Sequence, residues 1–147
     1  MLLKDWPSAP ASLAMILVVA FACASPPELD PNLLAPTAEQ LKLRSLETRT
    51  FEVASREQAV RAVIATLQDL DFIVERANAG FGVVTAARFA EPNYTDVIAV
   101  TVTVRPQEGG KMQIRANAIF NNKPITEPKV YQNFFAALER AIFLGRN

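Results

Sequence analysis

The chain of 147 residues contains no histidine and a single cysteine, Cys23. Without histidine, the sequence lacks the side chain that most often acts as a general base or binds a metal ion near neutral pH. One cysteine cannot form a disulfide within the chain or a zinc cluster of cysteines. Fifteen basic and fifteen acidic side chains leave no net charge, which argues against a general nucleic-acid-binding protein. The sequence therefore predicts no cofactor, no metal site and no nucleic-acid partner.

The sequence also lacks a recognisable set of catalytic side chains. Ser45 and Ser55 are the only serines after the first 25 residues, and no histidine is present to activate either. Asp69 and Asp71 are expected in solvent at a helix end, and not as an acid and base pair. The Gly-Phe-Gly sequence at residues 80–82 is too short for a phosphate-binding loop and is typical of a turn. We therefore expect a protein that is not an enzyme; a hydrolase would need carboxylates gathered in a cleft.

What the sequence does contain begins with an export signal. Residues 13–21 (LAMILVVAF) form an apolar run of nine residues. That is too short for a bilayer span of about 20 residues, and it fits a signal-peptide core of about 7–15. The small residue Ala22 and then Cys23 follow, which resembles a bacterial lipobox, in which the cysteine is acylated and becomes the new N-terminus. Cleavage at Ala22-Cys23-Ala24, before Ser25, fits the same residues and would discard the cysteine.

These features predict three parts. Residues 1–22 are expected to be a lipoprotein signal peptide. Residues 23–44 are expected to be the lipidated Cys23 and an extended tether, because prolines at positions 26, 27, 31 and 36 interrupt helices and central strands. Residues 45–147 are expected to form a single domain. Since each buried methylene contributes about 0.8 kcal/mol, two or three acyl chains on Cys23 would anchor the protein stably in a membrane.

Within the domain, β-branched and alternating apolar residues predict five strands, at residues 48–53, 72–76, 83–89, 97–105 and 111–120. Two helices are expected. The first follows Ser55, which fits a capping box with Gln58. The second carries its apolar stripe over residues 131–142, with Pro128 in its first turn and Gly145 as a left-handed cap.

Because the strand-to-strand connections are short, neighbouring strands should be antiparallel. The sequence therefore predicts an α+β, two-layer fold: a largely antiparallel five-stranded sheet with two helices on one face, in the order β-α-β-β-β-β-α.

Three segments of this domain carry a resemblance. Thr-Arg-Thr-Phe at residues 48–51, Leu-Gln-Asp-Leu-Asp-Phe at 67–72 and Tyr-Gln-Asn-Phe-Phe at 131–135 together resemble a class of small bacterial lipoproteins of unassigned function. The resemblance covers most of residues 46–145 and implies an outer-membrane lipoprotein without catalytic residues. Asp71 stands where those proteins carry glycine, and aspartate tolerates left-handed backbone better than most residues.

The element order is also similar to the helix-grip domain of the C component of the outer-membrane β-barrel assembly machinery. That is a likeness of topology, which does not carry function. The resemblance places the expected anchor in the outer membrane, with the domain facing the periplasm. Under the sorting rule that comes with it, Ala24 gives no signal for retention in the inner membrane, and retention there stays open.

Two binding surfaces follow from the predicted fold. The candidate partner surface consists of Tyr94, in a loop, and of Arg105, Arg115 and Asn117, on the outer face of the sheet. An exposed sheet face can meet another protein.

The leading hypothesis is a non-enzymatic, membrane-anchored periplasmic lipoprotein, an accessory or scaffold for envelope machinery that acts through protein–protein contacts. The alternative is a periplasmic binding module for a lipid or other apolar ligand. Its groove between helices and sheet would be lined by Phe72, Val102, Phe120, Phe134 and Leu138.

Overall fold

The computed structural model describes residues 32–92 and 94–145. The chain divides into two units, Met1–Ala35 and Pro36–Asn147. The predicted signal peptide, the proposed anchor Cys23 and most of the predicted tether lie outside the described residues. Of the first unit, the described residues form a turn, in which the Ala35 N–H donates to the Asn32 carbonyl oxygen at 2.8 Å. The fold that follows is that of the second unit.

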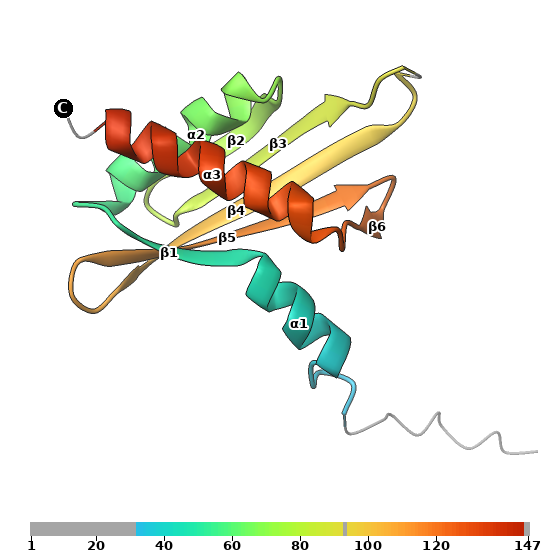
Figure 1. Ribbon diagram of the computed structural model, residues 1–147, viewed down its shortest axis with the longest axis horizontal. Coiled ribbons are helices and arrows are strands. Elements are labelled where there is room, and N and C mark those ends of the chain that lie inside the picture. The colour runs from blue at the N-terminus through green and yellow to red at the C-terminus, as the bar shows by residue number, and fades with distance from the viewer. Residues whose placement is uncertain (1–31, 93, 146–147) are drawn as a thin grey trace, which may run out of the picture. The chain divides into compact units, whose positions relative to one another are not determined.

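The second unit is an α+β fold built on one antiparallel sheet (Figure 1). Its elements are α1 (Ala38–Leu46), β1 (Thr48–Glu52), α2 (Arg56–Asp69), β2 (Ile73–Asn78), β3 (Val83–Phe89), β4 (Val97–Gln107), β5 (Lys111–Phe120), β6 (Lys123–Pro124) and α3 (Pro128–Leu144). The strand order is β1-β5-β4-β3-β2, with the two-residue β6 also paired to β5. The α+β class and the largely antiparallel sheet are confirmed. The predicted order lacks α1 and β6, so the expected count of two helices is wrong, and the short β6 is added to the five expected strands.

The hydrophobic core lies between the sheet and the pair of helices α2 and α3, which cover one face of it (Figure 1). We call this the inner face and the opposite one the outer face. Strand β4 shows why the faces differ: Val100, Val102 and Val104 are buried, while Thr101 and Arg105, at alternate positions on the other face, are exposed, as the two-residue period of a strand requires. Full burial of each such apolar side chain contributes about 1.5–3 kcal/mol.

Both long helices begin as the sequence predicts, but two of their cap details differ. The Ser55 hydroxyl accepts from the Gln58 N–H at 3.1 Å. The Gln58 side chain does not complete a capping box, because its amide instead donates to the Gly145 carbonyl oxygen at 3.1 Å. Gly145 has a φ of −78°, so the left-handed cap is wrong; its N–H continues the helical pattern by bonding the Ala141 carbonyl at 3.0 Å. At the end of α2, Asp71 does adopt left-handed backbone, with a φ of 62°.

Helix α1 corrects the predicted tether. An extended chain was expected through residue 44, yet Ala38–Leu46 is helical. The reason is local: residues 37–46 contain no proline, and Thr37 and Gln40 form a capping box. The Thr37 hydroxyl accepts from the Gln40 N–H at 3.2 Å, and the Gln40 side-chain oxygen accepts from the Thr37 N–H at 2.9 Å. The compact unit therefore begins before residue 45.

Strand β2 departs from regular pairing with β3 at one place. Val74 pairs with Ala86 and Arg76 pairs with Thr85, so the residue between them, Glu75, has no partner across the ladder. This is a β-bulge, in which two residues of one strand lie opposite one residue of the other.

Candidate functional site

A polar groove of about 840 Å³ lies on the outer face of the sheet, between α1 and strands β1, β4 and β5. Every side chain that lines it is polar except Leu41. The strands supply these polar groups because the residues between the buried positions of β4 and β5 point away from the core. Helix α1 forms one wall of this groove.

The groove brings together three of the four residues predicted as the partner surface. Arg105, Arg115 and Asn117 all line it, whereas Tyr94 does not. Tyr94 lies in the connection between β3 and β4 and is 66% exposed. Sequence reasoning missed Arg44, the α1 residue that completes the groove, because that segment was interpreted as a tether. The capping box at residues 37–40 was the signal that could have revealed the helix.

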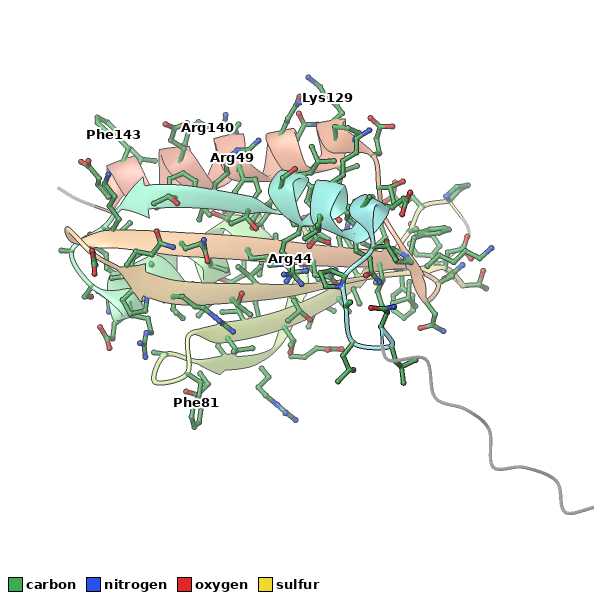
Figure 2. The ribbon with its side chains drawn as sticks, turned by 90° about the horizontal axis from the view of Figure 1, so that it is seen from below. Arg44, Arg49, Phe81, Lys129, Arg140 and Phe143 are labelled. Atoms are coloured by element: carbon green, nitrogen blue, oxygen red, sulfur yellow. The ribbon has the colours of Figure 1, made fainter. Side chains whose placement is uncertain are left out.

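The groove is basic. Arg44, Arg105 and Arg115 line it, and no acidic side chain from the described residues does. Arg115 forms an ion pair with Glu47 at 2.8 Å, while Arg44 and Arg105 have no ion pair within the described part of the chain. Figure 2 looks at this face and shows the Arg44 side chain beside the strands of the sheet. Two arginines of the groove are therefore available to an anionic ligand.

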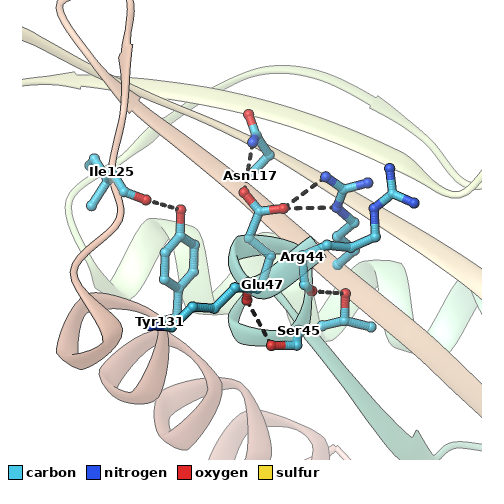
Figure 3. A network of polar contacts seen from close by, with 9 residues as sticks. Arg44, Ser45, Glu47, Asn117, Ile125 and Tyr131 are labelled. Atoms are coloured by element: carbon cyan, nitrogen blue, oxygen red, sulfur yellow. Dashed lines mark hydrogen bonds and ion pairs between the residues drawn. The ribbon is translucent and has the colours of Figure 1, made fainter. Parts of the chain in front are cut away.

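Below the groove, Glu47 forms a buried polar cluster at the end of α1 (Figure 3). Its Oε2 accepts from Arg115 Nε at 2.9 Å and from Nη2 at 2.8 Å, and its Oε1 accepts from Asn117 Nδ2 at 2.8 Å. The Glu47 backbone carbonyl also accepts from the Ala116 N–H at 2.9 Å. Since bonds to an ionised group are roughly twice as strong as neutral ones, this cluster fixes α1 to β5.

Tyr131 borders the cluster from α3 (Figure 3). Its side chain is buried, and its hydroxyl donates to the Ile125 carbonyl oxygen at 2.7 Å. Burial raises the pKa of the Tyr131 phenol, and the nearby Glu47 carboxylate raises it further. The phenol is therefore neutral near pH 7 and connects α3 to the segment before it.

A second, apolar pocket of about 300 Å³ lies on the inner face, between the sheet and the facing ends of α2 and α3. The space arises on β5, whose inward residues shrink from Ile114 to Ala116 and Ala118. We call this the inner pocket. Its lining is predominantly hydrophobic, and it includes Arg88 from β3.

The lining predicted for an apolar groove is correct in part. Phe72 and Phe134 line the inner pocket. Val102 and Leu138 are fully buried and do not, because they pack in the closed part of the core. Phe120 also does not line it; at the end of β5 its side chain is 39% exposed.

Two further findings bear on chemistry and membranes. Among residues 32–92 and 94–145, no group of three or more histidine, cysteine, aspartate or glutamate side chains is placed to hold a metal ion. None of the helices in the described part of the chain is long and apolar enough to cross a membrane.

No family model matches this chain, and no curated protein matches its sequence.

Proposed function

We propose that the protein is a non-enzymatic lipoprotein of the bacterial envelope whose domain binds an acidic segment of a partner protein in the outer-face groove. The observation that carries this proposal is the groove's charge: three arginines line it without an acid. Glu47 neutralises Arg115, which leaves Arg44 and Arg105 for the partner. Carboxylates accept charge-assisted hydrogen bonds from guanidinium groups, and charge complementarity favours rapid and specific association.

The rest of the groove suits a peptide. Hydroxyl groups of Thr101 and Thr103 and the amide of Gln113 line it beside the arginines. These groups both donate and accept hydrogen bonds, so they can pair with a partner's backbone between its acidic side chains. The domain would act as an accessory or scaffold, held at the outer membrane by Cys23 and facing the periplasm.

The groove is tested by site-specific photo-crosslinking in intact cells. A crosslinking amino acid at Thr101, in the groove, should capture a partner protein, whereas one at Gln132, exposed on α3, should not. The double variant Arg44→Glu/Arg105→Glu should abolish the Thr101 product. The matched variant Arg61→Glu/Arg140→Glu changes two exposed arginines of α2 and α3 outside the groove and should retain it. Equal capture at both positions, or a product unaffected by charge reversal in the groove, would disprove this function.

The anchor is tested separately. The mature wild-type protein should begin at Cys23, carry acyl chains and remain with the membrane fraction. Cys23→Ser should release the protein from that fraction. A mature wild-type protein that begins at Ser25 and is found in the soluble fraction would show that the protein has no lipid anchor.

A second function, binding of an apolar ligand, is favoured by the inner pocket. Its volume of about 300 Å³ is at the lower end of the range of about 300–1,000 Å³ for small-molecule sites. A neutral apolar dye such as Nile red should bind the purified protein, and Ala118→Leu should reduce binding because the larger side chain fills the pocket floor. If the dye does not bind the wild-type protein, or binds the Ala118→Leu variant equally well, the inner pocket is not a site for an apolar ligand.

A further inference from the structure

We propose that the inner pocket binds a single-chain amphiphile with an anionic head group, its chain beneath α2 and α3 and its head group at Arg88. This inference rests on the second proposed function and adds the chemical class of the ligand. It follows from three properties of the pocket: its lining, its opening and its one cation.

The lining suits an alkyl chain. The interior surfaces are side chains such as Leu67, Val100 and Phe134 over a floor of Ala116 and Ala118. Burial of each methylene group in such a site favours binding of the alkyl chain. A volume of about 300 Å³, at the lower limit for small-molecule sites, admits one short chain and excludes the two chains of a phospholipid.

The opening lies where α2 ends and α3 begins. Leu70, the C-cap of α2, and Val130 and Asn133, in the first turns of α3, line the pocket and are exposed. Leu70 is 36% exposed and Val130 is 41% exposed, so the alkyl chain of the ligand can enter the pocket over an apolar rim. A polar head group would remain at this rim, in contact with water.

Arg88 supplies the contact for the head group. It extends from the inner face of β3, and its guanidinium carbon lies 5.1 Å from the centre of the Phe72 ring, a cation–π contact that orients the group. Its Nε is buried and has no hydrogen-bond partner in residues 32–92 and 94–145. No acid pairs with Arg88 among the described residues.

An arginine that is partly buried, held by an aromatic ring and left without an acid is suited to a carboxylate or phosphate. The oxygen of a neutral head group can accept only a weaker hydrogen bond from the guanidinium than a carboxylate or phosphate oxygen does. The two anionic head groups share this chemistry, so the ligand is either a free fatty acid or a single-chain phosphate lipid.

The test is displacement of Nile red from the full-length protein by three ligands of equal chain length: decanoate, decyl phosphate and decanol. We expect at least one anionic ligand to bind more tightly than decanol. Arg88→Gln should raise the Kd of that ligand about tenfold, equivalent to about 1.4 kcal/mol, and leave the Kd of decanol unchanged. Arg88→Lys, which retains the charge, should restore much of the affinity. Arg76→Gln, an exposed arginine on β2 outside the pocket, should match the wild type.

The outcomes separate the two proposals. Tighter binding of decanoate or of decyl phosphate supports the inference and indicates a fatty acid or a phosphate lipid as the source. Equal binding of all three ligands, or an equal loss for all three in Arg88→Gln, overturns the inference while the apolar-ligand function stands. If Nile red and all three ligands fail to bind the wild type, both proposals are wrong.

Discussion

The ion pair between Glu47 and Arg115 should respond very differently to removal of each partner. The Glu47 side chain is 1% exposed and the Arg115 side chain is 38% exposed. Arg115→Met therefore leaves a buried carboxylate with only Asn117 as its donor, and such an uncompensated charge costs about 3 kcal/mol of unfolding free energy. Glu47→Gln removes the charge but keeps a carbonyl oxygen for Asn117, and Arg115 can turn to water. Its cost should be about 1 kcal/mol.

The double variant Glu47→Gln/Arg115→Met tests whether the buried Glu47 charge causes the loss of stability in Arg115→Met. It leaves no buried charge without a partner, so it should be more stable than Arg115→Met by about 1–2 kcal/mol. Measured against the sum of the two single costs, about 4 kcal/mol, this is a coupling energy of about 2–3 kcal/mol, within the range measured for contacting residues. Urea unfolding followed by circular dichroism gives the four free energies, with the wild type and Glu47→Gln completing the cycle. Additive costs, or a double variant less stable than Arg115→Met, would refute the view that Glu47 is the charge that needs a partner.

Two further predictions concern stability. Gly82 has a φ of 65° and an added Cβ would overlap the Val104 carbonyl oxygen, so Gly82→Ala should cost about 2–4 kcal/mol from backbone strain and overpacking, measured by urea unfolding. Gly109→Ala, with a φ of 73° but open space around it, should cost only the strain, about 1–2 kcal/mol. Burial and the nearby carboxylate raise the pKa of Tyr131 above 10.0. The contribution of the neutral phenol to the free energy of unfolding is therefore fully present below pH 10.0 and is lost as the pH rises through the folded-state pKa. Tyr131→Phe should cost about 1 kcal/mol at neutral pH, because the Ile125 carbonyl loses its donor, and should show a smaller alkaline loss.

Each of these predictions has its own control. Equal costs for the two glycine variants would show that close approach at Gly82 does not matter. For the alkaline loss, Tyr94→Phe changes the other tyrosine, which is exposed, and should leave the pH dependence as in the wild type. If Tyr94→Phe rather than Tyr131→Phe reduces the alkaline loss, the buried phenol is not its cause.

Local patterns predict the strands well. Strands β3 and β5 have the bounds expected from alternation, Val83–Phe89 and Lys111–Phe120. Strand β4 extends beyond the expected end at residue 105 because Pro106 still pairs with Met112 at the start of the hairpin. The same alternation put Arg105, Arg115 and Asn117 on one face, which is why three of the candidate partner residues meet in one groove.

Long-range features could not be predicted in this way. Glu47 is 68 residues from Arg115 and 70 from Asn117 in the sequence, so no local pattern indicated that it would be buried between them. The lining of the inner pocket was predicted only in part, with Phe72 and Phe134 correct. Large residues such as Val102 and Leu138 were expected to line it, but they fill space completely, and the cavity forms where Ala116 and Ala118 leave room.

The bulge at Glu75 has a consequence for self-association. Strand β2 is an edge strand, and a regular edge offers unpaired N–H and carbonyl groups to a second copy of the chain. Ile73 on this strand is 69% exposed, which would add an apolar contact to such a pairing. A bulge bends the strand and interrupts its regular hydrogen-bonding pattern, and the charges of Glu75 and Arg76 lie on the same edge. Deletion of Glu75 should therefore straighten the edge and produce concentration-dependent oligomers. In the intact chain, a single unpaired residue opposes strand-by-strand assembly at this edge.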